Sequence, residues 1–309
     1  MRYTQLGKTG IEVSTITFGC WELGNDGKWN FTSDENNIAV LRRAFDRGVT
    51  TFDTAEGYGD GHSETVVARA LGGIRSHCVI ASKVSPSHLR AADVRQAAEN
   101  SLRNLGTDYI DLYYIHWPNN DIPLDETLGA FLRLKEEGKI RAIGVSNFSL
   151  EQLKAAMAIT RIDAVQLEYS LLQRAPEDSG ILPYCAANEI AFTSYSSLAK
   201  GLLTGAYHLG KARIAPDDFR AERRLFLPEH LSKETPLIHL LRDIAGELDT
   251  SIAQVAMAWL LARPGMTTAI VGTQRIEHLD DNLAAADLIL PQEAVDRLDA
   301  VSTEVLASL

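Results

Sequence analysis

The chain has 309 residues, of which 45% are hydrophobic and 23% are charged, proportions that are typical of a globular protein with a sizeable core. Its formal net charge of −11 argues against a nucleic-acid or anionic-membrane partner, because either partner would need basic surface on the protein. The three cysteines, Cys20, Cys78 and Cys185, form no C-x-x-C pair, so neither a disulfide framework nor a zinc site is predicted.

The N-terminal region carries no apolar leader pattern, so we expect a cytoplasmic protein that is not exported. Its residues alternate around a Gly-Lys-Thr-Gly turn at 7–10, which predicts a β-hairpin ahead of the main fold. A strand candidate at 14–21 follows and ends in a glycine and an aromatic residue. Thr32 and Glu35 have capping-box spacing, which predicts a helix that begins there and is closed by Gly48.

A helix, a closing glycine, a short apolar strand and a polar residue then recur along the chain. Further strands are predicted at 49–52, 78–82, 109–115, 140–145, 164–168, 190–195 and 268–271. Further helices are predicted at 63–71, 93–105, 124–137, after a capping box at Ser149 and Gln152, around 183–188, and at 236–248, 252–262, 276–286 and from Pro291. The apolar helix at 252–262 is too short to span a bilayer, so no membrane partner is expected.

Eight strands that alternate with helices predict an α/β fold, a (β/α)8 TIM barrel formed by residues 1–309 as a single domain. Residues 200–235 are rich in glycine, proline and charge, which predicts a long loop after the seventh barrel strand. In such a barrel the carboxyl ends of the strands form the rim that holds the active site.

Four residues near the ends of consecutive strands are candidates for proton transfer. Taken alone, Asp53 and Tyr58 are compatible with a turn cap and a half-buried loop residue. Lys83 alone is compatible with a solvated lysine, and His116 with a core histidine. Together they favour a catalytic set in which Lys83 lowers the pKa of Tyr58 and is itself held by Asp53. His116 would donate a hydrogen bond to a carbonyl oxygen.

The same residues, in this order and spacing, resemble the aldo-keto reductases. The similarity is carried by Asp53-Thr54-Ala55 with Tyr58-Gly59, by Ser82-Lys83, Ile115-His116, Gly144-Val145-Ser146-Asn147-Phe148 and Asn282. It extends from Tyr3 to Leu290 and is greatest toward the bacterial branch that includes the potassium-channel β subunits, because of the stretch 196–205.

The resemblance implies NADPH-dependent reduction of an aldehyde or ketone, with Tyr58 as the general acid and Asp53, Lys83 and His116 as its catalytic partners. It implies that Ser146, Asn147 and Gln166 hold the nicotinamide carboxamide and that Tyr195 stacks on the ring. The remaining implied cofactor contacts are Gly19, Cys20, Trp21, Asp53, Ser196, Leu198, Lys200, Gly201, Gly272, Thr273, Arg275 and Asn282. The implied substrate contacts are Trp21, Tyr58, His116 and Trp117, and no metal site is expected.

Arg275, at the start of a predicted helix, is well placed to pair with a 2′-phosphate, which favours NADPH over NADH. Two departures from the family pattern limit that preference, because Val271 replaces a frequent proline and Gln274 replaces a frequent arginine. Trp29 and Phe31 are interpreted as residues that pack under loops.

The sequence leaves other questions open. The arginines of the long loop, Arg213, Arg220, Arg223 and Arg224, suit a solvated face more readily than a loop that closes over the cofactor. A redox-sensing subunit that binds the nucleotide with little turnover is an alternative function, since the catalytic residues alone do not exclude it. The sequence also leaves open the carbonyl substrate, the favoured direction and whether the chain forms a homo-oligomer.

Overall fold

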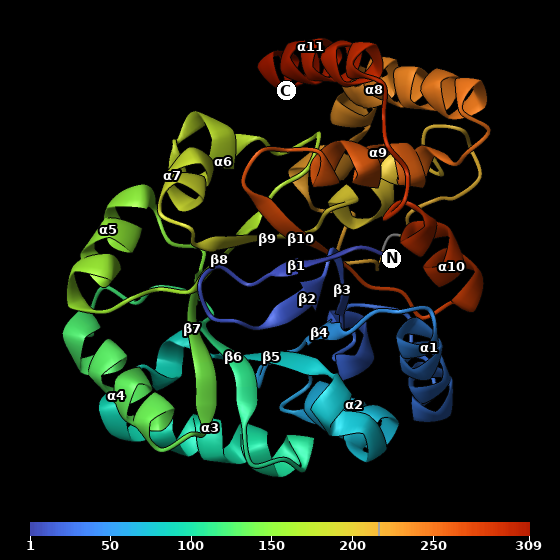
Figure 1. Cartoon of the computed structure of the whole chain (residues 1–309). Coiled ribbons are helices and arrows are strands. Elements are labelled where there is room, and N and C mark those ends of the chain that lie inside the picture. The colour runs from blue at the N-terminus through green and yellow to red at the C-terminus, as the bar shows by residue number, and fades with distance from the viewer. Residues whose placement is uncertain (216) are drawn as a thin grey trace.

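The computed structural model describes residues 1–215 and 217–309, and it confirms the predicted barrel of parallel strands. The barrel strands run in the order β10-β3-β4-β5-β6-β7-β8-β9, and β10 pairs with β3 to close the ring (Figure 1). They are β3 (Ile16–Gly19), β4 (Thr51–Asp53), β5 (Val79–Val84), β6 (Ile110–Ile115), β7 (Ile140–Ser146), β8 (Ala164–Glu168), β9 (Ala191–Tyr195) and β10 (Met266–Val271).

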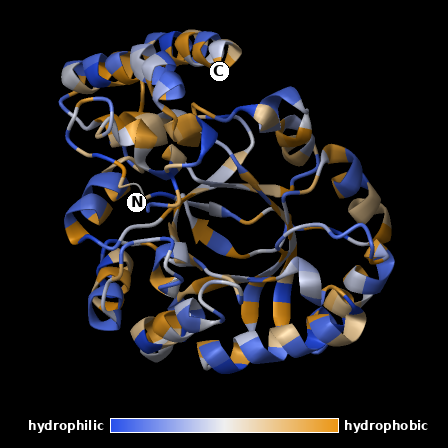
Figure 2. Cartoon of the chain, turned by 180° about the vertical axis from the view of Figure 1, so that it is seen from behind, coloured by the Kyte–Doolittle hydropathy of each residue, from blue (hydrophilic) through white to orange (hydrophobic). Residues whose placement is uncertain are grey.

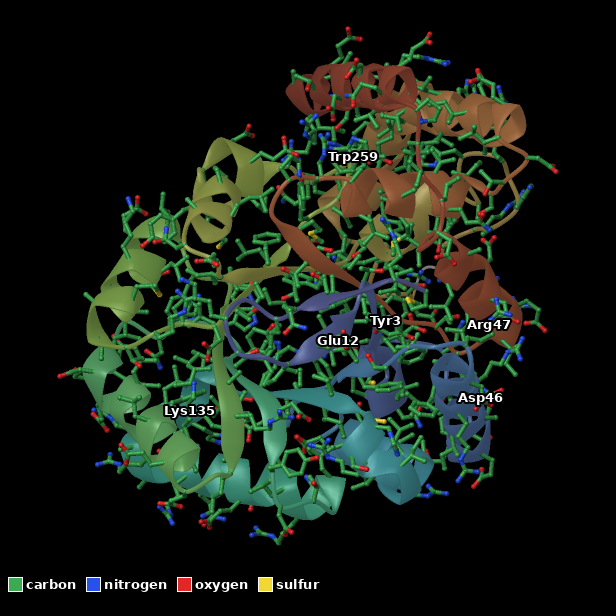
Figure 3. The ribbon with its side chains drawn as sticks, in the orientation of Figure 1. Tyr3, Glu12, Asp46, Arg47, Lys135 and Trp259 are labelled. Atoms are coloured by element: carbon green, nitrogen blue, oxygen red, sulfur yellow. The ribbon has the colours of Figure 1, made fainter. Side chains whose placement is uncertain are left out.

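The predicted N-terminal hairpin is confirmed, and it plugs one end of the barrel. β1 (Tyr3–Gln5) and β2 (Glu12–Ser14) pair antiparallel and lie across the centre of the ring, where Tyr3 and Glu12 mark them (Figures 1 and 3). Leu6, Ile11 and Val13 are at most 4% exposed and pack on residues near the amino ends of the barrel strands. Because the hairpin closes this end, access to the barrel interior is left to the carboxyl rim.

Helices surround the barrel, and each mixes hydrophobic and hydrophilic residues along its length (Figure 2). Their apolar sides are buried in the core, where burial of one large side chain stabilises the fold by about 1.5 to 3 kcal/mol. They are α1 (Asp34–Asp46), α2 (His62–Leu71), α3 (Ala91–Leu105), α4 (Leu124–Glu136), α5 (Leu150–Ile159), α6 (Ala175–Asp178), α7 (Ile181–Ala187), α8 (Pro228–Glu247), α9 (Ile252–Leu261), α10 (Ile276–Ala284) and α11 (Gln292–Ser308). Within the described residues, no helix combines the length and apolarity that a bilayer crossing requires.

Helix ends test the capping predictions. The capping box at Ser149 and Gln152 is confirmed, with both reciprocal hydrogen bonds at the start of α5. The predicted box at Thr32 is wrong, because Ser33 is the N-cap of α1 and its side chain accepts a hydrogen bond from the Asn36 amide. The N-cap is therefore Ser33, one residue after the threonine that the spacing had indicated.

The predicted start of α8 at Pro236 is wrong. The helix begins at Pro228 and passes through Pro236, which lies on its exposed side, where water can satisfy the carbonyl that proline leaves without a donor. Glu234 is fully buried and pairs with His208 at 3.1 Å, which anchors the first half of the helix. The loop after β9 is shorter than predicted, since the 3-10 helices η4 (Ala199–Thr204) and η5 (Arg224–Phe226) also lie within 200–235.

Candidate active site

The carboxyl rim brings the four predicted catalytic residues together. Lys83 Nζ lies 2.5 Å from Asp53 Oδ1, 2.8 Å from the Thr54 carbonyl oxygen and 3.2 Å from the Tyr58 hydroxyl. The ring of His116 meets the ring of Tyr58 edge to face, with centroids 5.8 Å apart. All three ammonium hydrogens of Lys83 therefore have an oxygen within reach, and the phenol lies between the lysine and the histidine.

Strand geometry explains how Lys83 reaches this cluster. The sequence had placed Lys83 after its strand, but β5 continues to Val84, so that Lys83 belongs to the strand itself. Alternate residues of a strand face opposite sides, and the side chains of Ala81 and Lys83 both lie inside the barrel. The lysine is consequently 0% exposed, which a position in a loop would not have ensured.

Backbone packing fixes the loop that carries Tyr58. A Cβ atom at Gly59 would collide with the carbonyl oxygen of Gly24, and Gly59 has a φ of +61°. The hydroxyl of Ser63 donates to the Cys20 carbonyl at 2.8 Å and lies 2.9 Å from the Thr54 hydroxyl. Gly24 and Gly59 thus allow two loops to meet backbone to backbone.

Lys83 lowers the pKa of Tyr58 as predicted, but burial, which the sequence analysis did not consider, outweighs this effect. Burial raises the pKa of Tyr58, and although the Lys83 ammonium lowers it, Asp53 raises it again, so the balance is a raised pKa. For Lys83, burial lowers the pKa, but Asp53 and Tyr58 together more than reverse that effect and leave its pKa raised. At neutral pH the site therefore holds a protonated phenol beside a charged ammonium group.

His116 is held in its neutral form. Burial, and secondarily the nearby Lys83 ammonium, lower the pKa of His116 from 6.5 to about 3. A neutral imidazole keeps one N–H that can donate to a substrate oxygen.

The residues predicted to hold the nicotinamide lie on adjacent strands. Ser146 of β7 is the register partner of Gln166 of β8, and Gln166 Nε2 donates to Asp53 Oδ2 at 2.8 Å. Asn147 has a φ of +62° and donates to the His116 carbonyl at 2.9 Å. The hydroxyl of Tyr195 donates to Asn147 Oδ1 at 2.8 Å. Ser146, Asn147 and Tyr195 thus form one hydrogen-bonded group, while the Gln166 side chain bonds directly to the catalytic cluster.

The loop after β9, which holds four of the implied cofactor contacts, curves sharply. Ser196, Ala199, Lys200 and Gly201 all have positive φ values, of 51°, 47°, 54° and 101°. Consecutive residues of this kind turn backbone N–H groups toward one side, which suits an anion. Lys200 Nζ lies 2.7 Å from Glu168 and 3.0 Å from the Ser196 hydroxyl, while Leu198 packs in the core at 8% exposure.

The implied cofactor contacts Gly272, Thr273, Arg275 and Asn282 lie on α10 or just before it. The amide of Arg275 donates to the Thr273 hydroxyl at 3.1 Å, and Asn282 is buried at 6% exposure on the same helix. Arg275 itself is exposed, and among the described residues its guanidinium enters no ion pair. A Cβ atom at Gly272 would lie 2.5 Å from the Gly19 carbonyl oxygen, so β3 and β10 approach closely here.

Comparison with known proteins identifies the chain. The family model for the Aldo/keto reductase family matches residues 15–303. The chain belongs to this family. Aldo/keto reductases are oxidoreductases that act on aldehydes, ketones and alcohols, and this confirms the resemblance seen in the sequence.

Three related proteins show how close the similarity is. The chain is 37% identical over 294 residues to the aldo-keto reductase YhdN of Bacillus subtilis, covering 91% of this chain and 87% of that protein. It is 30% identical over 329 residues to the NADH-specific methylglyoxal reductase of Escherichia coli, covering 97% and 100%. A Klebsiella pneumoniae aldo/keto reductase solved with NADP and acetate is 32% identical, with a TM-score of 0.78 and coverage of 97% and 95%.

An aromatic wall beside Tyr58 was not predicted in full. In this aldo/keto reductase, Trp21 lies with its ring centroid 6.4 Å from that of Tyr58, 5.3 Å from Trp29 and 5.6 Å from Phe219. Trp29 packs as predicted, whereas Phe31 is 81% exposed and its predicted packing is wrong. Phe219 lies in a loop without periodic pattern, so no signal in the sequence pointed to it.

Two charged residues also lie at this wall: Arg220, for which the predicted solvated position is wrong, and Glu22, which the sequence analysis did not single out. Arg220 is not solvated, because its guanidinium pairs with Asp218, reaches the Lys200 carbonyl oxygen at 3.3 Å and lies over the Trp29 ring. Burial raises the pKa of Glu22 to about 7, although Arg220 acts in the opposite direction. Trp117, predicted to contact substrate, is 48% exposed at the rim.

An open cleft of about 860 Å³ lies outside this wall, and Gly24, Gly57 and Gly59 are among its lining residues. It borders the loop of Tyr58 but includes none of the four catalytic candidates, so the cleft does not define the substrate site.

Proposed function

We propose that this aldo/keto reductase is an NADPH-dependent carbonyl reductase in which Tyr58 protonates the carbonyl oxygen. The observation that carries the proposal is the buried contact of Lys83 with both Asp53 and the Tyr58 hydroxyl. It places a proton donor beside a fixed positive charge at the open end of the barrel.

The residues of the rim suit a nicotinamide dinucleotide. The curved backbone at 196–201 offers N–H groups to a diphosphate, and the exposed guanidinium of Arg275 can pair with a phosphate near the start of α10. Ser146, Asn147 and Gln166 would hold the carboxamide, which donates and accepts hydrogen bonds as they do. Bound in this way, the reduced nicotinamide supplies a hydride.

The catalytic residues handle the proton that accompanies this hydride. His116 donates its N–H to the carbonyl oxygen and fixes its direction. Tyr58 is protonated at neutral pH, so it can give its proton to that oxygen as negative charge develops there. The Lys83 ammonium, 3.2 Å from the Tyr58 hydroxyl, stabilises the phenolate that remains. Carbon gains the hydride, oxygen gains the proton, and the product is an alcohol.

NADPH is the proposed cofactor in preference to NADH. Arg275 supports this choice, and so does the Klebsiella pneumoniae relative that was solved with NADP. Gln274 gives no second cation, and its side chain donates to the Glu22 carbonyl at 2.9 Å. Because the Escherichia coli relative is named as NADH-specific, the test compares both nucleotides. We further propose that the substrate is a small aldehyde or ketone whose apolar part contacts Trp21.

The test follows the absorbance of NADPH and NADH in the presence of aromatic and aliphatic aldehydes. We expect Tyr58→Phe to lower the turnover number by about 10²- to 10⁴-fold, the usual contribution of a positioned general acid. Its affinity for NADP⁺, measured by quenching of tryptophan fluorescence, should stay within about twofold of the unaltered protein. Tyr3→Phe, which removes a phenol from the hairpin at the opposite end of the barrel, is the matched control and should change neither quantity.

Two results would contradict the proposal. Unchanged turnover in Tyr58→Phe would show that Tyr58 is not the general acid. Tight binding of NADPH without consumption by any aldehyde in the unaltered protein would favour a nucleotide-binding regulatory subunit.

A further inference from the structure

A carboxylate in the loop of Tyr58 has no role in the account so far. Glu56 stands two residues before Tyr58, and its side chain is 13% exposed. Its Oε1 atom accepts a hydrogen bond from the amide of Ser85 at 2.6 Å and another from Nδ1 of His88 at 2.9 Å. Because a carboxylate oxygen only accepts, Nδ1 of His88 carries a hydrogen. Glu56 therefore ties the loop after β4 to the segment that directly follows β5.

The backbone of this loop lies against the same segment. The amide of Glu56 donates to the Lys83 carbonyl oxygen at 3.3 Å. A Cβ atom at Gly57 would lie 3.4 Å from the Ser85 hydroxyl oxygen, so the loop backbone passes close to Ser85. Lys83 belongs to β5 and Tyr58 follows Gly57 directly, so these contacts bear on the distance between the ammonium and the phenol.

The loop of His116 reaches this segment from the other side. Ser85 is the N-cap of the 3-10 helix η3 (Pro86–His88). Asn119, three residues after His116, donates from Nδ2 to the Pro86 carbonyl oxygen at 2.9 Å. One short segment thus joins the loop of the proposed proton donor to the loop of the imidazole that orients the substrate.

We propose that Glu56 is a positioning residue that holds the Tyr58 hydroxyl at hydrogen-bonding distance from the Lys83 ammonium during proton transfer. Without its carboxylate, the 3.3 Å bond from the Glu56 amide would be the one hydrogen bond, among the described residues, that still joins residues 56 and 57 to β5. The inference rests on the proposed function, since it assigns Glu56 to the step in which Tyr58 gives its proton to the carbonyl oxygen.

The test compares Glu56→Ala with the unaltered protein in the reduction of an aldehyde by NADPH. We expect the turnover number to fall by about tenfold or more, because a misplacement of about 1 Å can cost up to about 10²-fold. The affinity for NADP⁺ should stay within about twofold, since Glu56 is not among the proposed cofactor contacts. The ratio of turnover in H₂O to turnover in D₂O should rise, because transfer of the Tyr58 proton becomes slower relative to the other steps.

Two further variants separate position from charge. Glu56→Gln keeps an oxygen that can accept from Ser85 and His88, so its turnover should stay within about threefold and its solvent isotope effect should not change. Ser85→Pro removes the donor and leaves the charge of Glu56 in place. Ser85 has a φ of −69°, which proline adopts without strain, so this variant should reproduce the effects of Glu56→Ala even if Glu56→Ala does not fold.

Glu126 offers a matched control. Its carboxylate also accepts a backbone amide, that of Ala91 at 3.0 Å, and pairs with Arg90, but it lies on α4 outside the loops of Tyr58 and His116. Glu126→Ala should therefore change neither the turnover number nor the solvent isotope effect.

The outcomes separate this inference from the proposed function. Unchanged turnover and isotope effect in Glu56→Ala or in Ser85→Pro, with Tyr58→Phe inactive, would overturn the role of Glu56 and leave the general acid in place. An equal loss in Glu56→Gln and Glu56→Ala would also overturn it, because charge and not position would then matter. Full activity of Tyr58→Phe would instead contradict the proposed function, and with it the inference.

Discussion

His116 links the electrostatics of the rim to the stability of the fold. Its pKa is held at about 3 in the folded protein, below the ordinary value of 6.5. Between these two pH values the unfolded chain binds a proton that the folded chain does not bind. The contribution of His116 to the free energy of unfolding is therefore complete above about pH 6.5 and is lost as the pH falls toward 3.

This linkage predicts a weaker pH dependence of stability in His116→Gln. Between pH 7 and pH 5, the free energy of unfolding should fall by about 1 to 2 kcal/mol less in the variant than in the unaltered protein, allowing for partial exposure of the ring. Urea denaturation at both pH values measures the difference. Equal losses in the two proteins would show that another group titrates in this range.

The sequence placed Asp53, Tyr58, Lys83 and His116 at one rim, because strand ends can be located from apolar runs and turns. The sequence could not show that burial affects the pKa of Tyr58 more than the charge of Lys83 does. The depth of that hydroxyl depends on the backbone contact between Gly24 and Gly59, which joins two loops far apart in the chain. A pKa that is set by packing therefore needed the structure.

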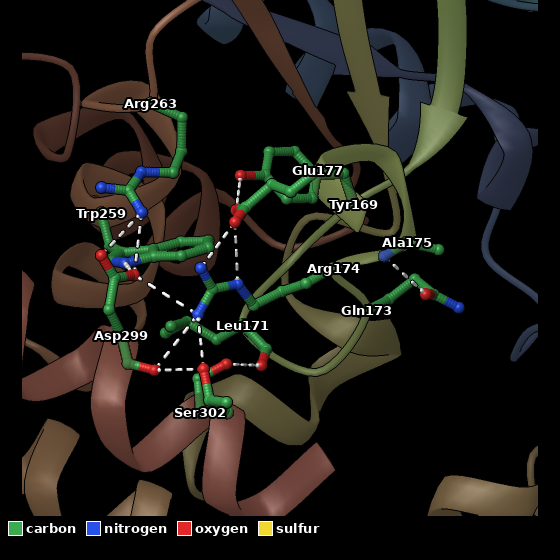
Figure 4. A network of polar contacts seen from close by, with 11 residues as sticks. Tyr169, Leu171, Gln173, Arg174, Ala175, Glu177, Trp259, Arg263, Asp299 and Ser302 are labelled. Carbon is green, nitrogen blue, oxygen red and sulfur yellow. Dashed lines mark hydrogen bonds and ion pairs between the residues drawn. The ribbon is translucent and has the colours of Figure 1, made fainter. Parts of the chain in front are cut away.

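At the scale of elements, a polar network joins the segment after β8 to α9 and α11 (Figure 4). Trp259 of α9 is 0% exposed, and its indole N–H donates to Asp299 Oδ1 of α11 at 2.9 Å. Arg263 reaches both oxygens of the same carboxylate, at 2.8 and 2.9 Å. Arg174 lies over the Trp259 ring at 5.5 Å and pairs with Glu177. Trp259 thus marks the side of the barrel on which α8 and α11 lie (Figure 3).

Asp299 accepts hydrogen bonds from two residues of this network, so we expect it to stabilise the fold. Asp299→Ala should lower the free energy of unfolding by about 2 kcal/mol, because it removes charge-assisted hydrogen bonds and leaves the Trp259 N–H and the Arg263 guanidinium without their acceptor. Asp243→Ala is the control, since Asp243 pairs with Arg242 on an exposed face and should change stability by less than about 0.5 kcal/mol. Thermal or urea denaturation measures the free energy of unfolding of both variants. Equal losses in the two variants would contradict a stabilising role for Asp299.

Element boundaries show what the sequence could and could not predict. The Ser149 capping box was correct because both of its residues act locally. The start of α8 was missed because the rule that proline begins a helix is local, whereas burial of Glu234 against His208 depends on a loop contact. Phe219 was missed and Arg220 was wrongly interpreted as solvated for the same reason, since both pack against Trp29, a residue far from them in the chain.

At the scale of the whole molecule, the barrel was predictable because each strand and helix repeats the same alternation of apolar and turn residues. Closure of β10 on β3 follows from the number of strands. The hairpin was predictable as an element, but its function as a plug was not, because the partners of Leu6 and Ile11 come from several strands that are far apart in the chain. That plug leaves one open rim, and the proposed chemistry lies there.

The most direct test of a carbonyl reductase at this rim is the fate of the hydride. NADPH that carries deuterium at both C4 positions of the nicotinamide is incubated with the enzyme and an aldehyde, and the alcohol is analysed by mass spectrometry. The account predicts an alcohol with one deuterium on the former carbonyl carbon and none on its oxygen after exchange with water. An alcohol without that deuterium, or no alcohol while the nucleotide stays bound, would contradict it.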